Sequence, residues 1–206
     1  MAAVMKMIRS RVGGKRSIVD TENTTATAAR IKQVHSETDL AVRLESGELD
    51  ERQIVRSINE AAFGRLEEAD LVDSLRTEGV VLASLVAVLQ GRIVGHILFS
   101  RMSIEAPGRP TPAAALAPMA VLPEYQRQGI GGQLIRHGLD VLRRQGEQIV
   151  IVLGHPDYYP RFGFSCEKAS SLESPFPRDA FMAMELNSGA LVGIHGKVKY
   201  PAPFGL

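Results

Sequence analysis

Residues 119–132 combine a strand end, a polar turn and three glycines at the start of a helix, and together they could bind an anion. Gly129, Gly131 and Gly132 have no Cβ to cover their backbone N–H groups. The first N–H groups of a helix lack intrahelical partners, and the helix dipole adds positive potential there. Arg127 adds a positive charge beside them. The pattern therefore predicts a cradle for a diphosphate.

Other uses of a glycine-rich turn have to be weighed against this one. A packing role, in which glycines bring a helix close to a sheet, needs no ligand at all. A dinucleotide-binding turn needs G-x-G-x-x-G directly after the strand, whereas Leu134 stands where the third glycine belongs. A Walker loop needs Gly-Lys-Ser or Gly-Lys-Thr. Because Gln133 follows Gly132, a Walker loop is excluded.

The same segment resembles the acetyl-CoA signature of the GNAT N-acetyltransferase superfamily. The core of that signature is Gln/Arg-x-x-Gly-x-Gly/Ala, and here it is Gln126-x-x-Gly129-x-Gly131. The flanks also agree, because a strand ending in Ala-Val is followed by x-Pro-x-Tyr and then by the glycine-initiated helix. The resemblance is therefore more specific than the short core alone.

A second motif lies at the matching distance downstream. Residues 158–164, Tyr-Tyr-Pro-Arg-Phe-Gly-Phe, are similar to the family's Phe-Tyr-x-Lys-x-Gly-Phe, which follows its fifth strand. The preceding His155-Pro156-Asp157 departs from the commoner Asn-x-x-Ala. With the C-terminal pattern of residues 189–200, the chain resembles a bacterial-type subgroup of N-acetyltransferases over residues 38–206.

The resemblance implies a reaction and a site. It implies transfer of the acetyl group of acetyl-CoA, without a metal, to a primary amine by direct attack in a ternary complex. Backbone groups of Met119 and Val121 would hold the pantetheine arm, and Tyr159 would be the general acid, with Tyr158 as the alternative. The residues that would hold the pyrophosphate are Gln126, Arg127, Gln128, Gly129, Ile130, Gly131 and Gly132.

Several questions stay open at this level. The alternative function is an inactive CoA-binding sensor or interaction module with the same fold. The general base is unassigned among His96, Glu105, Glu124, His155 and a chain of waters. The acceptor could be a small-molecule or a peptide amine, and the protein could be a monomer or a homodimer.

The periodicity of apolar residues predicts the elements that position these motifs. Their order is β–α–α–β–β–β–α–β–α–β–β, and it indicates an α/β (α+β) fold. The GNAT resemblance implies a mixed, mostly antiparallel sheet of about seven strands with helices on both faces. We expect strands at residues 38–44, 80–89, 92–105, 113–121, 149–153, 181–186 and 197–200, and helices at 51–63, 67–78 and 129–145. Pro118 predicts a bulge or an irregular position within its strand.

Composition narrows the class of protein. Lys and Arg number 24 against 23 Asp and Glu in 206 residues, so no global field favours nucleic acid. A single cysteine, Cys166, excludes an internal disulfide and a zinc cluster of cysteines. No apolar run approaches the roughly 18 residues of a membrane span, and we expect a cytoplasmic protein. Residues 1–37 are basic with no apolar period, so we expect a disordered extension before one domain at 38–206.

Overall fold

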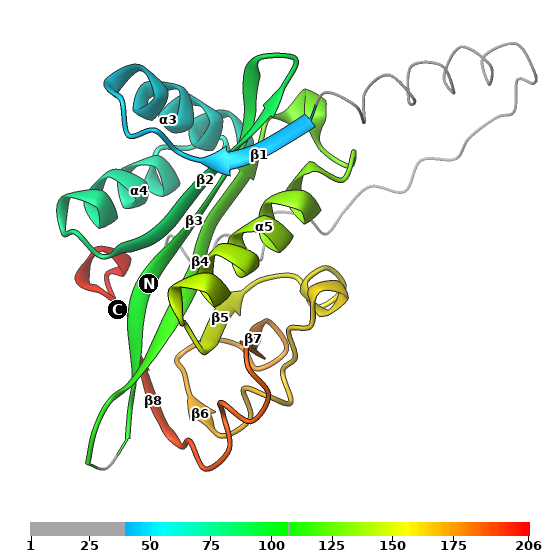
Figure 1. The fold of residues 1–206 in the computed structure, drawn as a ribbon. Helices are drawn as coiled ribbons and strands as arrows, with labels where there is room; N and C mark the ends of the chain where they lie inside the picture. The colour runs from blue at the N-terminus through cyan, green and yellow to red at the C-terminus, as the bar shows by residue number, and fades with distance from the viewer. Residues whose placement is uncertain (1–39, 107) are drawn as a thin grey trace, which may run out of the picture.

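A mixed sheet runs through the residues that the computed structural model describes, 40–106 and 108–206 (Figure 1). The predicted extension and the boundary at residue 38 lie outside them. Within the described residues the sheet has eight strands, in the order β1-β2-β3-β4-β5-β7, and β8 pairs with β3 and β6. The strands are β1 (Leu40–Leu44), β2 (Val81–Leu89), β3 (Arg92–Glu105), β4 (Thr111–Val121), β5 (Ile149–Leu153), β6 (Leu172–Glu173), β7 (Phe181–Glu185) and β8 (Gly196–Lys199).

Pairing in the sheet is antiparallel except at two places. β4 runs parallel to β5, and β6 runs parallel to β8. The expected mixed, mostly antiparallel sheet is confirmed. The two-residue β6 is the strand that the sequence pattern did not predict, because two residues carry no alternation.

Helices cover both faces of the sheet, as predicted. The α-helices of the described residues are α3 (Leu49–Phe63), α4 (Glu67–Thr77) and α5 (Ile130–Gln145), and the short 3-10 helices are η1 (Pro123–Tyr125), η2 (Tyr159–Phe162) and η3 (Ala202–Phe204). The segment after β5 is thus a 3-10 turn where the sequence predicted a helix. No helix in the described residues is both long enough and apolar enough to span a bilayer.

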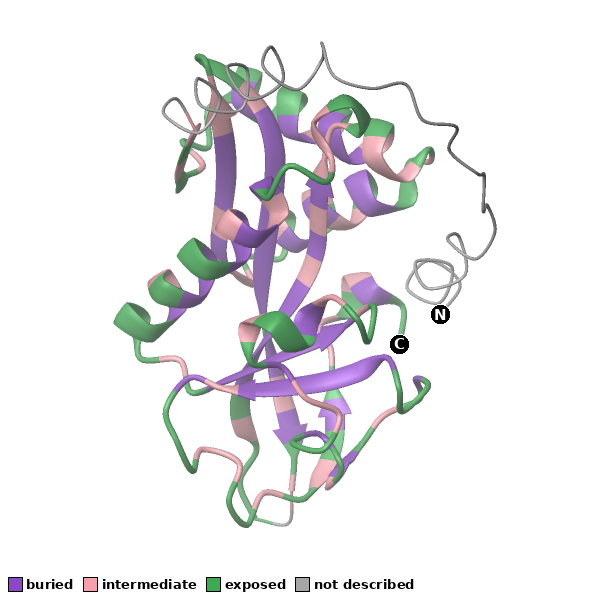
Figure 2. Cartoon of the chain, turned by 90° about the vertical axis from the view of Figure 1, so that its right-hand side faces the viewer, coloured by how far each residue is buried: buried purple, intermediate pink, exposed green. Residues whose placement is uncertain are grey.

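Two apolar cores result, one on each face of the sheet. One core joins Val55, Val72 and Leu75 of α3 and α4 to the sheet, and the other joins α5 to its opposite face. Figure 2 shows the buried strands between helices whose outer sides are exposed. At Gly138 of α5, a Cβ would lie 2.2 Å from the ring of Phe99 on β3, so glycine permits the close approach of helix and sheet.

The centre of β4 carries the irregularity that Pro118 predicts. Leu116 lies opposite Phe99, but Met119 lies opposite Ile97, so two β4 residues face a single residue of β3. β4 pairs with β5 only from Ala114 to Leu116. Beyond this bulge the two parallel strands diverge, which leaves one edge of β4 without a strand partner in the described residues.

Candidate functional site

The divergence of β4 from β5 leaves backbone groups available for a ligand. The N–H of Leu122 donates to the carbonyl of Val94 at 2.9 Å, so Leu122 and, two residues earlier, Ala120 face β3. Met119 and Val121 alternate with them, and their backbone groups point to the open edge. The side chain of Gln126 donates to the Val121 carbonyl at 2.9 Å. The N–H of Val121 and both backbone groups of Met119 therefore remain directed at the open edge.

The start of α5 follows this strand through a tight turn. Arg127 and Gly129 both adopt left-handed conformations, with φ of 63° and 86°, and Gly129 is the N-cap. The N–H of Gln133 makes the first helical bond, to the Gly129 carbonyl at 3.1 Å. The N–H groups of Ile130, Gly131 and Gly132 precede that bond and have no helical acceptor. The first turn of α5 contains no acidic residue, so its positive potential is not neutralised locally.

The residues that the sequence predicted to bind the pyrophosphate lie together in this turn, but three of them do not offer their side chains to a ligand. Gln126 turns its side chain back to the strand, where it closes the turn, and Gln128 bonds the Glu124 carbonyl at 3.1 Å. Ile130 is buried and anchors the helix start, so only its backbone is available to a ligand. Arg127 is exposed at the mouth of the turn.

The aromatic motif packs directly on this helix start. A Cβ on Gly131 would lie 2.9 Å from the hydroxyl of Tyr158, and one on Gly132 would lie 3.4 Å from the ring of Phe162. A side chain at residue 131 would therefore crowd the hydroxyl, whereas a Cβ at residue 132 would be in ordinary contact with the ring. Two arginines that the sequence reading missed stack on these rings. Arg161 lies over Tyr158 at 4.4 Å and Arg136 lies over Phe162 at 5.3 Å.

A signal for Arg136 exists in the sequence. It follows Gly132 by four residues, so it lies on the same helical face one turn later. Its guanidinium comes within 3.5 Å of the position that a Cβ on Gly132 would take. A basic side chain next to the N–H groups of a helix start strengthens an anion site.

The two neighbouring tyrosines have different surroundings. Tyr159 is 6% exposed, and its ring packs edge-on against Phe164 at 5.8 Å. Gly154 accommodates that ring, since a Cβ there would lie 2.1 Å from it. Burial raises the pKa of Tyr159 far above the usual value for tyrosine. Tyr158 is half-buried, and burial also raises its pKa, against the opposing charges of Arg161 and Arg136. Both phenols therefore stay protonated at neutral pH.

His96 belongs to a closed network between α3 and β2. It is fully buried, its Nδ1 lies 3.2 Å from Asn59 Nδ2, and its Nε2 lies 2.9 Å from Ser84 Oγ. Ser84 donates to Glu45, so His96 Nε2 carries the proton and Nδ1 accepts from Asn59. Burial, followed by the charge of Arg76, lowers the pKa of His96 to about 3. The imidazole is therefore neutral and fully enclosed by its partners.

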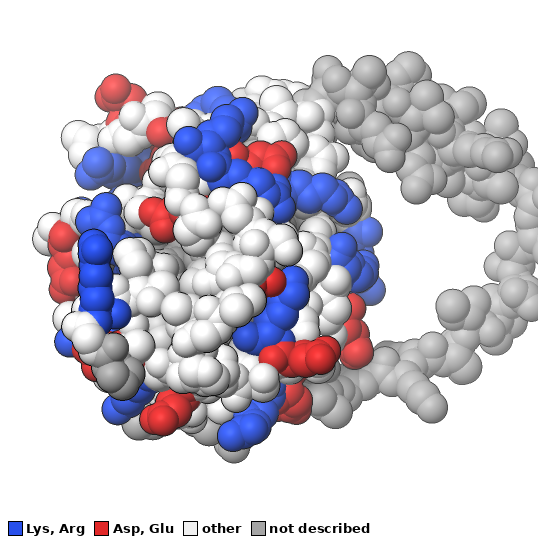
Figure 3. All heavy atoms as spheres, turned by 60° about the horizontal axis from the view of Figure 1, so that its bottom comes forward, with Lys and Arg blue, Asp and Glu red and all other residues white. Residues whose placement is uncertain are grey.

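The other candidate bases are dispersed. Glu105 pairs with Lys199 at 3.0 Å, near the tip of the β3–β4 hairpin. Glu124 is exposed in η1, and His155 is exposed after β5. Figure 3 shows the face that carries the hairpin tip, where side chains of both signs surround a largely uncharged middle. Like-charged side chains do not gather into one patch on that face.

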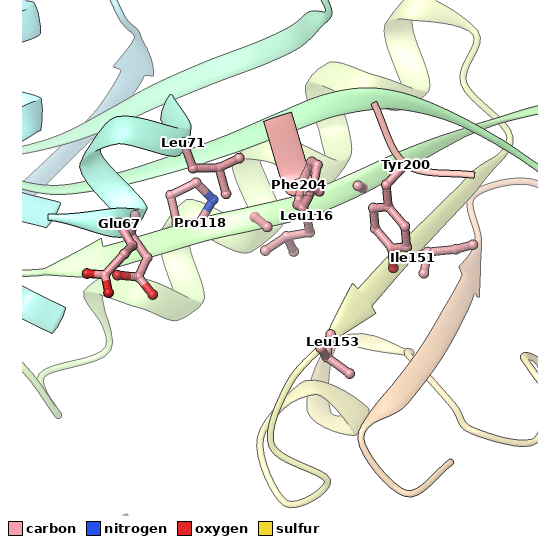
Figure 4. A pocket seen from close by; sticks show the side chains of 11 residues that line it. Glu67, Leu71, Leu116, Pro118, Ile151, Leu153, Tyr200 and Phe204 are labelled. Carbon is pink, nitrogen blue, oxygen red and sulfur yellow. The ribbon is translucent and has the colours of Figure 1, made fainter. Parts of the chain in front are cut away.

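A pocket of about 30 Å³ lies on the α4 side of the sheet, at the bulge of β4 (Figure 4). It brings together α4, β4, β5 and the C-terminal segment. Its lining residues are Glu67, Glu68, Leu71, Ala115, Leu116, Ala117, Pro118, Ile151, Leu153, Tyr200 and Phe204. None of these residues was predicted as a site residue from the sequence.

Comparison with known proteins agrees with this geometry. Residues 43–166 match the model of the acetyltransferase (GNAT) domain. This chain belongs to the GNAT family of acetyltransferases. It is thus an acetyl-CoA-dependent N-acetyltransferase, and the predicted family and fold are confirmed.

Two proteins of Escherichia coli and one of Brucella melitensis are similar to this chain. The uncharacterized N-acetyltransferase YjhQ of Escherichia coli is 44% identical over 126 residues, 60% of this chain and 70% of YjhQ. The crystal structure of E. coli YhbS in complex with CoA has a TM-score of 0.74 at 31% identity, over 82% of this chain and 93% of YhbS. A GNAT acetyltransferase of Brucella melitensis in complex with acetyl-CoA has a TM-score of 0.66 at 33% identity, over 80% and 97%.

Proposed function

We propose that this enzyme acetylates a primary amine by direct attack on acetyl-CoA, with both substrates bound at once. The observation that carries the proposal is that one strand–turn–helix unit offers backbone groups without a strand partner on β4 and N–H groups without a helical acceptor at the start of α5. The complexes of YhbS with CoA and of the Brucella enzyme with acetyl-CoA support the same ligand here.

The proposed cofactor contacts follow the order of the unit. The pantetheine arm extends along the open edge of β4, where Met119 and the N–H of Val121 bond it as a further strand would. The pyrophosphate lies at the start of α5, on the N–H groups of residues 129–132. Arg127 adds positive charge, while Gln126 and Gln128 shape the turn. No metal takes part in this proposed arrangement.

The chemistry needs a neutral amine and a polarised thioester. An amine with a pKa near 10.4 is neutral in only about one molecule in 2,500 at pH 7, so it must first lose a proton. Its nitrogen then bonds the carbonyl carbon, while a backbone N–H of β4 stabilises the oxyanion. The C–S bond breaks, its electron pair stays on sulfur, and the nitrogen loses its second proton. The sulfur gains a proton, and the products are the acetamide and CoA.

We assign the donation of that proton to Tyr159. Its phenol is protonated because burial raises its pKa. The same shift weakens it as an acid, and a thiolate with a pKa of about 8.5 leaves tolerably without help. Tyr159 therefore contributes by donating a hydrogen bond to the developing thiolate, at or below the low end of general acid catalysis.

The test is acetyl transfer itself. The full chain is incubated with acetyl-CoA and a panel of primary amines, and free thiol and acetylated product are measured. We expect thiol release that depends on the amine, and initial-rate lines that intersect, as a ternary complex requires. Tight CoA binding without thiol release for any amine would contradict the proposal and favour a binding module. Parallel lines would contradict direct attack, because they indicate an acetyl-enzyme intermediate.

A further inference from the structure

The pocket beside α4 reaches the gap between β4 and β5. Leu116 pairs with Val152, and this is the last position at which the two strands pair. Leu116 belongs to the core on the α5 face of the sheet, whereas Ala115 belongs to the core on the α4 face, and both residues line the pocket. The pocket therefore extends from the α4 face to the point where the strands part.

The proposed path of the donor ends at the same point. The pyrophosphate lies at the start of α5, and the pantetheine arm runs back along β4 past Val121 and Met119. The next residues in that direction are Pro118 and Ala117, which form the bulge of β4 and line the pocket. A thioester at the end of the arm would lie beside the inner end of the pocket. The acyl chain, which is the part of the donor beyond the thioester carbonyl, is therefore directed at the pocket.

The pocket is small, and most of its walls are apolar. Leu71, Ile151 and Leu153 supply aliphatic side chains. Tyr200 and Phe204 form an aromatic wall with ring centroids 5.0 Å apart (Figure 4). Since roughly 10–15 Å³ holds one water-sized group, a volume of about 30 Å³ holds about two carbon atoms. The methyl group of an acetyl chain or the ethyl group of a propionyl chain fits this space, and a longer chain would displace a wall.

Two carboxylates of α4 also line the pocket, and Figure 4 shows Glu67 at its α4 end. Glu68 is 4% exposed and is held by Arg65, whose Nε lies 2.9 Å and 3.1 Å from its two oxygens. Glu67 is less compensated, because its side chain is 47% exposed and its distance to Arg65 Nε is 4.0 Å. An acyl chain that ends in a carboxylate would meet a like charge here.

We propose that this pocket binds the acyl chain of the donor and limits the enzyme to acetyl and propionyl groups. Its volume excludes a butyryl chain, and its carboxylates exclude malonyl and succinyl chains. The inference rests on the proposed function and specifies the donor. The reaction is the same for both acyl groups. The amine nitrogen bonds the acyl carbon, the bond from that carbon to sulfur breaks with its electron pair on sulfur, and a proton from the amine ends on the thiol.

The first experiment measures binding to the wild-type chain without an amine. The probes for calorimetric titration are CoA, acetyl-CoA, propionyl-CoA and butyryl-CoA. The Kd values for acetyl-CoA and propionyl-CoA should agree within about fourfold, which is the effect of one methylene. Butyryl-CoA should bind about tenfold to a hundredfold more weakly than propionyl-CoA, because the additional carbon overpacks the pocket.

The outcomes of this titration separate the two proposals. Equal affinity for butyryl-CoA and propionyl-CoA would overturn the pocket assignment and leave acetyl transfer intact, because amine-dependent thiol release tests that reaction separately. Failure of CoA and all three thioesters to bind would instead defeat the proposed function and this inference together.

The second experiment changes the size of the pocket at Leu71, which is partly buried on α4. With one amine acceptor held constant, Leu71→Ala should raise the kcat/KM ratio of butyryl-CoA to acetyl-CoA at least about tenfold. Leu71→Phe should lower the ratio of propionyl-CoA to acetyl-CoA by a similar factor. Leu66→Ala, at the exposed N-cap of α4, is the matched control and should change neither ratio. Because each ratio compares two donors on one protein, a general loss of stability does not change it. Unchanged ratios in both Leu71 variants would overturn the assignment.

The third experiment separates charge from size. Malonyl and isovaleryl chains have the same number of non-hydrogen atoms, and only the malonyl chain is charged. Leu71→Ala should therefore accept isovaleryl-CoA at least about tenfold better than malonyl-CoA. Adding Glu67→Gln should narrow this preference, whereas adding Glu78→Gln, at the exposed far end of α4, should leave it unchanged. Equal use of both donors by Leu71→Ala would overturn the role of the carboxylates.

Discussion

The proposed cofactor site and the pocket beside α4 are built differently. The cofactor site uses mainly backbone groups from one continuous segment, β4 through the start of α5. The pocket beside α4 is lined by side chains from α4, β4, β5 and the C-terminal segment. Backbone recognition constrains glycines at fixed spacing, so a short motif reveals it. Side-chain recognition depends on tertiary contacts that no short motif records.

The helices on the two faces are also held differently. α5 buries mainly apolar residues and glycines against the sheet. On the other face, Arg56 pairs with Asp70 at 2.7 Å and with Asp73 at 2.8 Å, which ties α3 to α4. Arg43 of β1 pairs with Glu51 of α3 at 2.7 Å. Acid should therefore weaken the packing of α3 and α4 on their face of the sheet more than the packing of α5 on the other face.

The largest expected effect is on the cofactor face. Gly131→Asp should raise the Kd for CoA more than a hundredfold, because a carboxylate would meet the pyrophosphate and the added Cβ would meet the Tyr158 hydroxyl at 2.9 Å. Calorimetric titration with CoA measures it. His137→Asp, on the exposed side of the same helix, should bind CoA nearly as the wild type does. Wild-type affinity in Gly131→Asp would remove the glycine turn from the cofactor site.

A smaller effect is expected at the two tyrosines, which belong to the core on the α5 face of the sheet. Tyr159→Phe should lower kcat tenfold to about a hundredfold and leave CoA affinity intact, since the apolar ring stays in place. The alkaline limb of the pH–rate profile should change as well. Tyr158→Phe is the matched control, because the hydroxyl that it removes lies beside Gly131 at the start of α5. If only Tyr158→Phe lowers kcat, Tyr158 is the residue that donates the proton to the departing sulfur. If both variants turn over like the wild type, solvent supplies that proton.

The sequence predicted the fold from local signals. Strand and helix periodicity located the long elements, and Pro118 predicted the bulge at which β4 and β5 part. The boundaries moved by a few residues, as with α3, which begins at Leu49 instead of residue 51. β6 was not predicted, because its pairing with β8 depends on tertiary contacts.

Side-chain environments were harder to predict than elements. Alternation placed His96 on one face of its strand, but its partner Asn59 lies 37 residues away on α3. Periodicity gives the face of a residue and not its neighbours, so a buried network and an open cleft produce the same pattern. The pocket position of Glu67 was not predicted, for the same reason. In the sequence it is one of several acidic residues at the start of a helix, where acids are favoured by the dipole alone.

The smallest expected effect tests the electrostatic half of the comparison. Arg43 and a backbone N–H of Ser46 hold the Glu51 carboxylate, and together they lower its pKa to about 2. The folded pKa is below the unfolded value of about 4.3, so the pair stabilises the fold above that value and stops doing so as pH falls toward 2. Arg43 is 46% exposed, so solvent screening limits the contribution to about 1 kcal/mol.

Arg43→Gln should therefore lower the free energy of unfolding by about 1 kcal/mol at pH 7, measured by urea titration. The difference from wild type should stay constant down to about pH 5 and shrink below about pH 4.5 as Glu51 takes up its proton. Buried His96, with a pKa of about 3, makes both proteins less stable below about pH 6.5, and this shared loss cancels in the difference. Arg143→Gln, which removes the exposed pair with Asp140 on α5, is the matched control and should change stability little at any pH. An equal loss in both variants, or a difference that does not depend on pH, would mean that ion pairs do not distinguish the two faces.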